Sequence, residues 1–346
     1  MTAMPSVRRV KRPRFALNRG LTAIGLLVAA GAVAGLALGW LGRFHPVADI
    51  ASHATCHLIG TLIGATLGVI ACRAGRTALA VTLVAVCAVS TLAIPSWLAS
   101  QAIWSLEDRT TPPTDGNIRI VSLNAWHSNR DVDALERFLE SVAADIIVLT
   151  EFGPAKSALA KRLANKFPHQ AGCSDNIWCA MHLLSRHPIM RSQTTSRHNG
   201  TGPPTVEVQF GAALRNLSVI GVHLMRPIDS RWGSYNEVTQ IAARVRALSK
   251  SAGAPVIVAG DFNLTPWSWN WRKFRDESGL KNAGPAWPAL SPASWPAAPL
   301  VAPQLAIDHV FVSDELSVTR IGLGPVVGSD HLPVIADIAG LKSVSR

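Results

Sequence analysis

From Gly20 to Ala99 the only charged side chains are Arg43, Asp49, Arg73 and Arg76. Leu21 to Leu41 is a run of 21 residues without a charge, which matches the roughly 20 residues that a helix needs to cross a hydrocarbon core. Two further apolar runs follow, His57 to Ala71 and Ala78 to Ala99. A signal peptide also has a basic start and an apolar centre. The first run is longer than such a centre, however, and two more follow it, so we predict three transmembrane helices within residues 21–99.

Basic residues near the ends of these runs predict the orientation of the chain. The tail before the first run carries six of them: Arg8, Arg9, Lys11, Arg12, Arg14 and Arg19. The loop before the third run has Arg73 and Arg76, whereas the loop after the first run has Arg43 alone. Because cytoplasmic loops carry the excess of Lys and Arg, residues 1–20 are expected to be a cytoplasmic tail. The protein is then a multi-pass protein of the cytoplasmic (inner) membrane, and everything after Ser100 is extracytoplasmic.

The formal net charge of +11 is concentrated in the membrane part. Residues 1–104 have nine Lys or Arg and one Asp, which gives +8, and residues 105–346 have 24 Lys or Arg and 21 Asp or Glu, which gives +3. No run of basic residues in the second part would track a nucleic-acid backbone. The composition of residues 105–346 therefore allows binding of nucleic acid but does not favour it.

Strand and helix patterns alternate from Asn117 onward, after a Pro-containing linker at residues 100–116. The predicted helices lie at 131–142, 157–167 and 236–248, and the predicted strands at 118–123, 145–150, 181–184, 206–210, 216–222, 256–258, 307–312, 318–321 and 334–338. Several strands follow one another with no helix between them. This arrangement favours an α+β domain over a doubly wound sheet, and we assign it to residues 117–340.

Polar side chains end most of these strands. Val256 to Val258 is typical of a buried strand, and it ends in Asp261 and Asn263. Taken alone, that pair indicates either an Asx turn or a site. The other strand ends carry Asn124, Glu151, His223, Asp308, Asp330 and His331. Acids, amides and histidines without a Cys or Ser nucleophile indicate attack of activated water on a phosphate with a divalent metal.

These motifs resemble, in order, those of the endonuclease/exonuclease/phosphatase (DNase I-like) superfamily. They are Val-Ser-Leu-Asn124, Val-Leu-Thr-Glu151, Gly-Val-His223, Ala-Gly-Asp261-Phe-Asn263, Ile-Asp308-His-Val and Gly-Ser-Asp330-His331-Leu-Pro. The resemblance implies a four-layer sandwich, in which two β-sheets pack together with helices outside. With its membrane spans, the architecture is similar to that of the bacterial membrane proteins of this superfamily linked to teicoplanin resistance.

The resemblance also implies a metal centre and a base. Glu151 is expected to bind Mg²⁺ or Mn²⁺, with Asn124 and Asp330 as further ligands of the metal or its water, since hard oxygen ligands are what Mg²⁺ prefers. Asp261 is expected to orient or deprotonate the attacking water. Asn263 is expected to hold that water or a phosphate oxygen.

Histidines complete the implied site. His331 is expected to donate to the phosphate, while Asp308 selects its tautomer and favours its charged form. His223 is expected to be the second histidine around the phosphate. His309 and His127 lie near these motifs and are expected to support the site rather than to take part in catalysis.

The two cysteines of the soluble part, Cys173 and Cys179, form an isolated close pair. In an extracytoplasmic domain such a pair favours a disulfide that closes a small loop. The alternative is two unrelated free thiols. No Cys and His cluster has the spacing of a zinc site.

Three tryptophans follow the Asp261 motif at alternate positions: Trp267, Trp269 and Trp271. On a strand they would share one face, whereas on a helix Trp269 would diverge from the other two. Exposed rings would favour a bilayer interface or an acyl chain. The alternative is that they pack in the core.

Together these features predict a membrane-anchored, metal-dependent phosphoesterase. Its expected partners are the lipid bilayer and a phosphate-containing substrate, either an envelope lipid or a lipid-linked pyrophosphate. The alternatives are an extracytoplasmic nuclease and a non-catalytic, anchored binding module. The full set of acids and histidines argues against the binding module.

Overall fold

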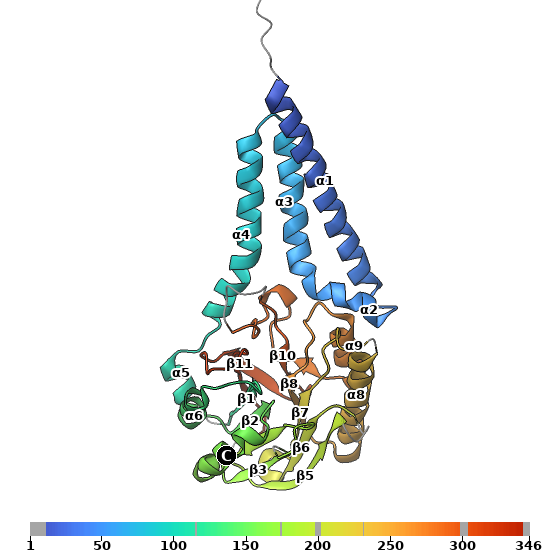
Figure 1. The fold of residues 1–346 in the computed structure, drawn as a ribbon. Helices are drawn as coiled ribbons and strands as arrows, with labels where there is room; N and C mark the ends of the chain where they lie inside the picture. Colours follow the sequence, from blue (N-terminus) through green and yellow to red (C-terminus); the bar gives the residue numbers. More distant parts are fainter. Residues whose placement is uncertain are drawn as a thin grey trace, which may run out of the picture. The chain divides into compact units, whose positions relative to one another are not determined.

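The computed structural model describes residues 12–114, 116–173, 175–197, 202–230, 232–297 and 304–341. The first 11 residues of the predicted cytoplasmic tail lie outside these ranges. The chain divides into two compact units, one formed by Met1–Leu38 with Ala54–Ile94 and the other by Gly39–His53 with Pro95–Arg346 (Figure 1).

Apolar helices make up the first unit. The unit contains most of α1 (Arg12–Leu41), α3 (Thr55–Arg73) and α4 (Thr77–Gln101). Within the described residues, Leu17–Leu41 and Pro46–Arg73 are long and apolar enough to cross a membrane, whereas Thr77–Thr91 is a shorter apolar helix. By length and composition, the structure therefore supports two of the three transmembrane helices that the sequence predicted.

Two glycines of α3 allow α4 to approach closely. A Cβ atom at Gly64 would lie 2.8 Å from Cβ of Cys87, and one at Gly68 would lie 2.7 Å from Cγ2 of Val84. Small residues at such positions let apolar helices pack with their backbones close together. The spacing of four between these glycines thus has a packing role.

Two six-stranded sheets form the centre of the second unit. The first has the order β11-β12-β1-β2-β4-β3 and the second the order β5-β6-β7-β8-β10-β9. The strands of the first are β1 (Ile118–Asn124), β2 (Ile146–Thr150), β3 (His169–Gly172), β4 (His182–Ser185), β11 (Ser317–Leu323) and β12 (Val334–Ala339). Those of the second are β5 (Ile189–Thr195), β6 (Thr205–Phe210), β7 (Ser218–His223), β8 (Val256–Asp261), β9 (Lys281–Asn282) and β10 (Asp308–Val312). β1 pairs with β2, and β7 with β8, in parallel, and the other strand pairs are antiparallel.

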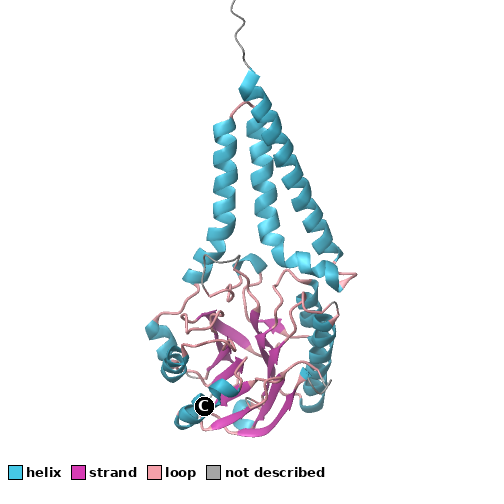
Figure 2. Cartoon of the chain, in the orientation of Figure 1, coloured by secondary structure: helices cyan, strands magenta, loops and turns pink. Residues whose placement is uncertain are grey.

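Helices cover the outer faces of both sheets (Figure 2). α6 (Val132–Ser141) and α7 (Ser157–Arg162) pack on the first sheet through side chains such as Phe138 and Leu159. α8 (Gly233–Ala252) and α9 (Trp269–Ser278) pack on the second through side chains such as Val238 and Phe274. A third apolar cluster fills the space between the sheets. This is the α+β sandwich of two packed sheets with outer helices that the sequence predicted.

Short helices complete the described residues. They are α2 (Pro46–Asp49), η1 (Ile50–Ala54), α5 (Leu106–Thr110), η2 (Pro154–Lys156), η3 (Leu163–Asn165), η5 (Ala212–Leu214) and η6 (Pro288–Leu290).

The sequence patterns missed α9 and the edge strands β3, β5 and β9. Most side chains of β5 are exposed, so its sequence lacks the alternation that marks a half-buried strand. The helix α9 begins among the tryptophans, with Ser268 as its N-cap. Trp271 is buried against Phe311, and Trp267 and Trp269 are partly buried. The structure therefore supports packing of these rings on the domain, which was the alternative to exposure at a bilayer interface.

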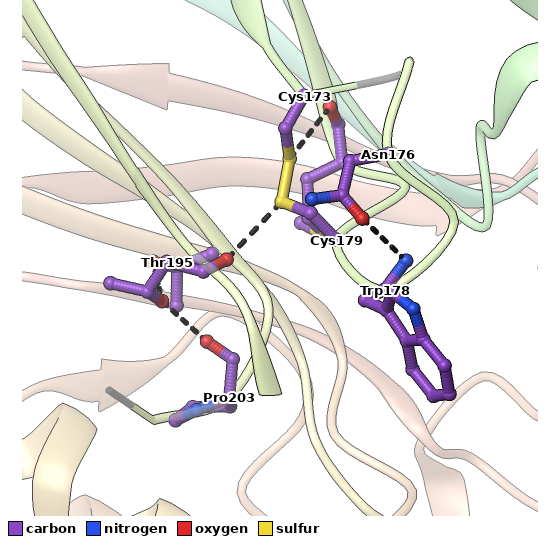
Figure 3. The surroundings of a disulfide bond; sticks show 8 residues. Cys173, Asn176, Trp178, Cys179, Thr195 and Pro203 are labelled. Carbon is purple, nitrogen blue, oxygen red and sulfur yellow. Dashed lines mark hydrogen bonds between the residues drawn. A yellow bond between two sulfur atoms is a disulfide. The ribbon is translucent and has the colours of Figure 1, made fainter. Parts of the chain in front are cut away.

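A disulfide joins Cys173 to Cys179 in the loop between β3 and β4 (Figure 3). Their Cα atoms are 5.8 Å apart. Sγ of Cys179 lies 3.2 Å from the carbonyl oxygen of Thr195 at the end of β5, and Oδ1 of Asn176 accepts from the backbone N–H of Trp178 within the loop. The bridge therefore holds this loop beside an edge strand.

A buried ion pair joins β1 to β12 and reaches the segment before β1. Arg119 donates from Nε and Nη2 to the two carboxylate oxygens of Asp337, at 2.7 and 3.0 Å. Its Nη1 donates to the carbonyl oxygens of Asp108, Arg109 and Thr111. Trp104, within the predicted linker, is buried with the guanidinium of Arg119 over its ring. Part of residues 100–116 is thus packed on the domain.

We predict that Asp337→Asn lowers the free energy of unfolding by about 3 kcal/mol, because it leaves the buried guanidinium of Arg119 without its counter-charge. Denaturant unfolding of the full chain in detergent, followed by tryptophan fluorescence, measures the change. Asp314→Asn is the matched control, since it removes the same charge from an exposed pair with Lys281 and should cost less than about 1 kcal/mol. Equal changes for the two variants would contradict the prediction.

Candidate functional site

The predicted site residues meet at one edge of the two sheets. The parallel strands β1 and β2 end side by side, with Asn124 opposite Thr150. In the second sheet β7 and β8 also end side by side, with His223 opposite Asp261, and β10 begins with Asp308 opposite Asp261. Parallel strands that end together hold their terminal side chains at one edge, which gives a rigid base for a site.

A cavity of about 610 Å³ lies at this edge. It is lined by six of the predicted residues, namely Glu151, His223, Asp261, Asn263, Asp330 and His331. Asn124 and Asp308 are not among the lining residues and are almost fully buried. Asn124 donates hydrogen bonds to the lining residues Glu151 and Asp261, and Asp308 accepts one from the lining residue His331.

Asn124 bridges the acids of the two sheets. Its Nδ2 donates to Oε1 of Glu151 and to Oδ2 of Asp261, each at 3.0 Å. Its Oδ1 accepts from the backbone N–H of Trp126 at 2.8 Å, and this contact sets which way the amide points. Asn124 therefore presents its N–H groups to the acids and orients both carboxylates.

The carboxylate of Glu151 is held in its charged form. Its backbone has a φ of 51°, and Oε2 accepts from the backbone N–H of His127 at 2.9 Å and lies 2.7 Å from Nδ1 of the same residue. Burial by itself would raise the pKa of Glu151, but His223 and the hydrogen bonds from Asn124 and His127 lower it to about 2. Glu151 is therefore an anion at neutral pH.

Asp261, Asp308 and His331 form a buried cluster. Nδ1 of His331 lies 2.7 Å from Oδ2 of Asp308, and its Nε2 lies 3.8 Å from Oδ2 of Asp261. Burial opposes a charge on the ring, but Asp308 and Asp261 raise the pKa of His331 to about 10. Burial, together with the charge of Asp308, raises the pKa of Asp261. The cluster thus combines a cationic donor with a carboxyl group of increased basicity.

His223 has the opposite charge preference from His331. Its Nε2 lies 3.8 Å from both Oε1 of Glu151 and Oδ2 of Asp261. Burial lowers the pKa of His223 despite these two acids. At neutral pH the cavity therefore has one charged and one neutral histidine.

Asn263 is both a turn residue and a cavity residue. Its backbone N–H donates to Oδ1 of Asp261 at 2.8 Å, and Nδ2 donates to the carbonyl oxygen of Leu224 at 2.9 Å. The first contact is the Asx turn that the sequence alone allowed. Since Asn263 also lines the cavity, the turn positions the residue for the site.

The two supporting histidines have different places. Nε2 of His309 donates to the carbonyl oxygen of Leu264 at 2.7 Å, and burial lowers the pKa of His309 to about 4. It does not line the cavity, so its role is structural. His127 is exposed, lines the cavity and contacts Glu151, which is closer to the site than the sequence indicated.

Other residues at or next to the cavity were not among the predicted catalytic and metal-binding residues. Nε1 of Trp295 donates to Oδ2 of Asp330 at 3.3 Å, and Oγ of Ser294 donates to Oδ2 of Asp308 at 2.6 Å. Both come from the Pro- and Ala-rich stretch at residues 283–304, which precedes β10. Arg226 also lines the cavity. Its position three residues after His223, at a strand end, is the one sequence signal that would have marked it.

The donor set suits a hard divalent cation. Glu151 supplies an ionised carboxylate, and Oδ1 of Asp330 is buried with no hydrogen-bond partner among the described residues. Such oxygens fit Mg²⁺ or Mn²⁺. Asp261, Asp308 and His331 also place ligand atoms within 4.8 Å of one another. This cluster is therefore a second candidate set of ligands beside Glu151 and Asp330.

Comparisons with known proteins give a family match and several similar folds. The sequence profile described as "Endonuclease/Exonuclease/phosphatase family" matches residues 121–331. A search of curated protein sequences gives no match.

Several solved structures have a similar fold. A 3′ phosphatase, NExo, from Neisseria bound to product DNA hairpin has a TM-score of 0.52 at 17% identity, covering 63% of this chain and 98% of that chain. Truncated Caenorhabditis elegans TDP2 has a TM-score of 0.51 at 17% identity, covering 64% and 98%. The human Nocturnin catalytic domain with bound sulfate anion has a TM-score of 0.51 at 16% identity, covering 65% and 94%. At these identities the likeness shows the fold alone.

We predict that the ring of His331 stays protonated well above neutral pH, and that Asp308→Asn lowers its pKa because the paired carboxylate is lost. NMR titration of the full chain with labelled histidine rings measures both. Since the pKa of about 10 exceeds the ordinary histidine value of 6.5, the ion pair stabilises the fold fully below about pH 6.5, and this contribution is lost as the pH rises through about 10. Asp314→Asn, which removes an exposed carboxylate, should leave the titration unchanged. A ring that titrates near its ordinary value in the unaltered protein would contradict the assignment.

Proposed function

The chain belongs to the Endonuclease/Exonuclease/phosphatase family, and on that premise we propose that it is a membrane-anchored, divalent-metal-dependent phosphoesterase. In this proposal its substrate is a phosphoester or pyrophosphate of an envelope lipid or lipid-linked molecule. The observation that carries the proposal is the composition of the cavity. A basic carboxyl group (Asp261), a cationic histidine (His331) and an anionic carboxylate (Glu151) face the same space from two sheets.

In this proposal, two histidines and an arginine of the cavity hold the phosphate. The charged ring of His331 donates from Nε2 to a phosphate oxygen, since its Nδ1 is engaged by Asp308. His223 and Arg226 line the same cavity and provide further donors. Donors that are held in place before the reaction stabilise the charge that develops on the phosphate oxygens.

Water attacks phosphorus with Asp261 as the base. As the new oxygen–phosphorus bond forms, the proton of the water passes to the Asp261 carboxylate, and the bond to the leaving oxygen breaks. Burial makes this carboxyl group more basic, which suits general base catalysis near neutral pH. Asn124 and the backbone N–H of Asn263 hold its two oxygens in place.

Glu151 and Asp330 would hold the divalent cation. When bound, the cation supplies positive charge that neutralises the phosphate and the leaving oxygen. Asn124 and His127 orient Glu151 for this role. Trp295 orients Asp330 through its Oδ2 and leaves Oδ1 available.

Three features support a lipid over a nucleic acid as the substrate. Two stretches of the chain are long and apolar enough to cross a membrane. Residues 105–346 carry a net charge of only +3, whereas binding along a nucleic-acid backbone depends on many cationic contacts. The cavity also has apolar lining residues, namely Leu224, Ile228, Leu305 and Ile307.

The proposal includes the location of the catalytic domain. We place it outside the cytoplasmic membrane, because the basic residues cluster before the first apolar run and between the second and third. The disulfide between Cys173 and Cys179 suits an oxidising compartment. This topology requires an odd number of spans, so it includes a third span formed by α4.

The topology predicts the behaviour of reporters fused after Arg346. A phosphatase reporter that folds only outside the cytoplasm should be active, and a fluorescent reporter that matures only in the cytoplasm should be dark. The same reporters fused after Arg76, in the loop before the third run, should show the reverse pattern. A cytoplasmic signal at the C-terminus would refute this topology.

We predict that the purified full chain releases phosphate from a polyprenyl pyrophosphate in detergent micelles when Mg²⁺ is present, and that EDTA abolishes the reaction. Asp261→Asn should lower kcat by about 10² to 10⁴, since the base is lost. Asp276→Asn, an exposed acid on α9, is the control and should retain activity.

DNA is the competing substrate in the same assay. Robust cleavage of a DNA oligonucleotide without release of phosphate from the lipid would overturn the lipid proposal. Full activity of Asp261→Asn would overturn the mechanism. An absence of hydrolysis with every substrate would favour the binding module.

A further inference from the structure

The segment that joins α1 to α3 reaches the catalytic cavity. Residues Gly39–His53 belong to the same compact unit as the catalytic domain. Two of them, Ile50 and His53, line the cavity together with Glu151 and His331. A part of the chain that lies between two apolar helices is therefore also part of the candidate active site.

Asp49 attaches this segment to the first turn of α9. Its side chain is 1% exposed. Oδ1 accepts from the backbone N–H of Trp269 at 2.7 Å, and Oδ2 accepts from Oγ of Ser268 at 2.6 Å and from the backbone N–H of Asn270 at 3.0 Å. A carboxylate at a helix N-terminus satisfies unpaired N–H groups and complements the helix dipole. Asp49 thus acts as a capping group that comes from a distant part of the chain.

Close packing supports the same attachment. Nε1 of Trp269 donates to the carbonyl oxygen of Gly39 at 3.0 Å. A Cβ atom at Gly42 would lie 2.7 Å from Cδ1 of Trp269 and 2.7 Å from Cα of Asp49, so only glycine fits there. The segment is held on the domain by directional contacts, which gives Ile50 and His53 defined positions.

His53 has a hydrogen-bond donor with no partner. Its Nδ1 accepts from the backbone N–H of Thr265 at 3.4 Å, so the hydrogen of the neutral ring is on Nε2. Nε2 is buried and has no hydrogen-bond partner among the described residues. An unpaired buried donor costs free energy, and this donor belongs to a residue that lines the cavity.

Residues of the same segment suit a membrane surface. Trp40 and Phe44 are 52% and 68% exposed. The guanidinium of Arg43 lies 3.4 Å from the ring centre of Trp40 and 4.3 Å from that of Phe44. Tryptophan and arginine are typical of the level of the lipid headgroups. On the cavity itself, Ile228 is 71% exposed.

We propose that Ile50 and His53 form the lipid-binding wall of the substrate site, and that Asp49 positions this wall. His53 donates from Nε2 to an oxygen of a phosphorylated lipid, next to the phosphate that reacts, while Ile50 and Ile228 contact the start of its hydrocarbon chain. This inference rests on the proposed function and assigns substrate selection to the segment between α1 and α3.

Steady-state kinetics with two substrates tests the assignment. The full chain in detergent is assayed with a polyprenyl pyrophosphate and with bis(p-nitrophenyl) phosphate, which has no lipid chain. His53→Leu should raise KM for the lipid about fivefold, the effect of one lost hydrogen bond, and leave kcat/KM for the soluble ester within about twofold. His53→Gln, which keeps an N–H donor, should restore most of the loss. Asp49→Asn should show the same lipid-specific defect.

Val47→Ala is the matched control, because Val47 is an exposed residue of the same segment and does not line the cavity. It should match the unaltered protein on both substrates. Equal losses of His53→Leu on both substrates, or no loss on either, would overturn the inference. Turnover of the soluble ester without turnover of the lipid would also overturn it and would leave the phosphoesterase proposal intact.

Lipid binding provides a readout that does not depend on turnover. Binding of the polyprenyl pyrophosphate to the full chain is measured in EDTA, and His53→Leu should weaken it about fivefold. If the protein hydrolyses neither substrate, the proposed function fails. Unchanged lipid binding by His53→Leu would then overturn the inference as well, whereas weakened binding would support it.

Discussion

The amide of Asn124 is the interaction on which the candidate site depends. Its Nδ2 donates to Glu151 at the end of β2 and to Asp261 at the end of β8, and the two acids belong to different sheets. Two packed sheets leave a seam at their common edge, and the side chain of Asn124 spans it here. Both carboxylates are therefore held at fixed positions before any substrate binds, which is the kind of preorganisation that phosphoryl chemistry requires.

Two histidines of the cavity, His331 and His223, have opposite charge preferences. His331 and His223 both contact Asp261, but only His331 also has Asp308 on its second nitrogen. That additional carboxylate outweighs the cost of burying a cation and raises the pKa of His331, whereas burial prevails at His223 and lowers its pKa. One histidine can therefore act as a charged donor while the other stays neutral.

Much of the fold and of the site could be predicted from local patterns. Buried strands such as β8 are continuous apolar runs, and the polar residues that end them lie at known sequence positions. Elements with exposed or mixed side chains, such as β5, have no such apolar run, and the sequence patterns therefore did not predict them. The tryptophans after Asn263 illustrate the limit. Their spacing allowed a strand or a helix, and the structure shows the helix α9 with Trp271 packed against Phe311.

The sequence by itself determined the family, the order of the strand-end motifs and the apolar character of the first third of the chain, because each is encoded in short contiguous stretches. Tertiary structure alone decided which donors face which acids, as with the bridging amide of Asn124. It also decided that Asp49, 219 residues before Ser268 in the chain, caps α9 and brings His53 to the cavity. Such contacts depend on how distant segments pack, and the periodicity of a local stretch holds no information about its distant partners.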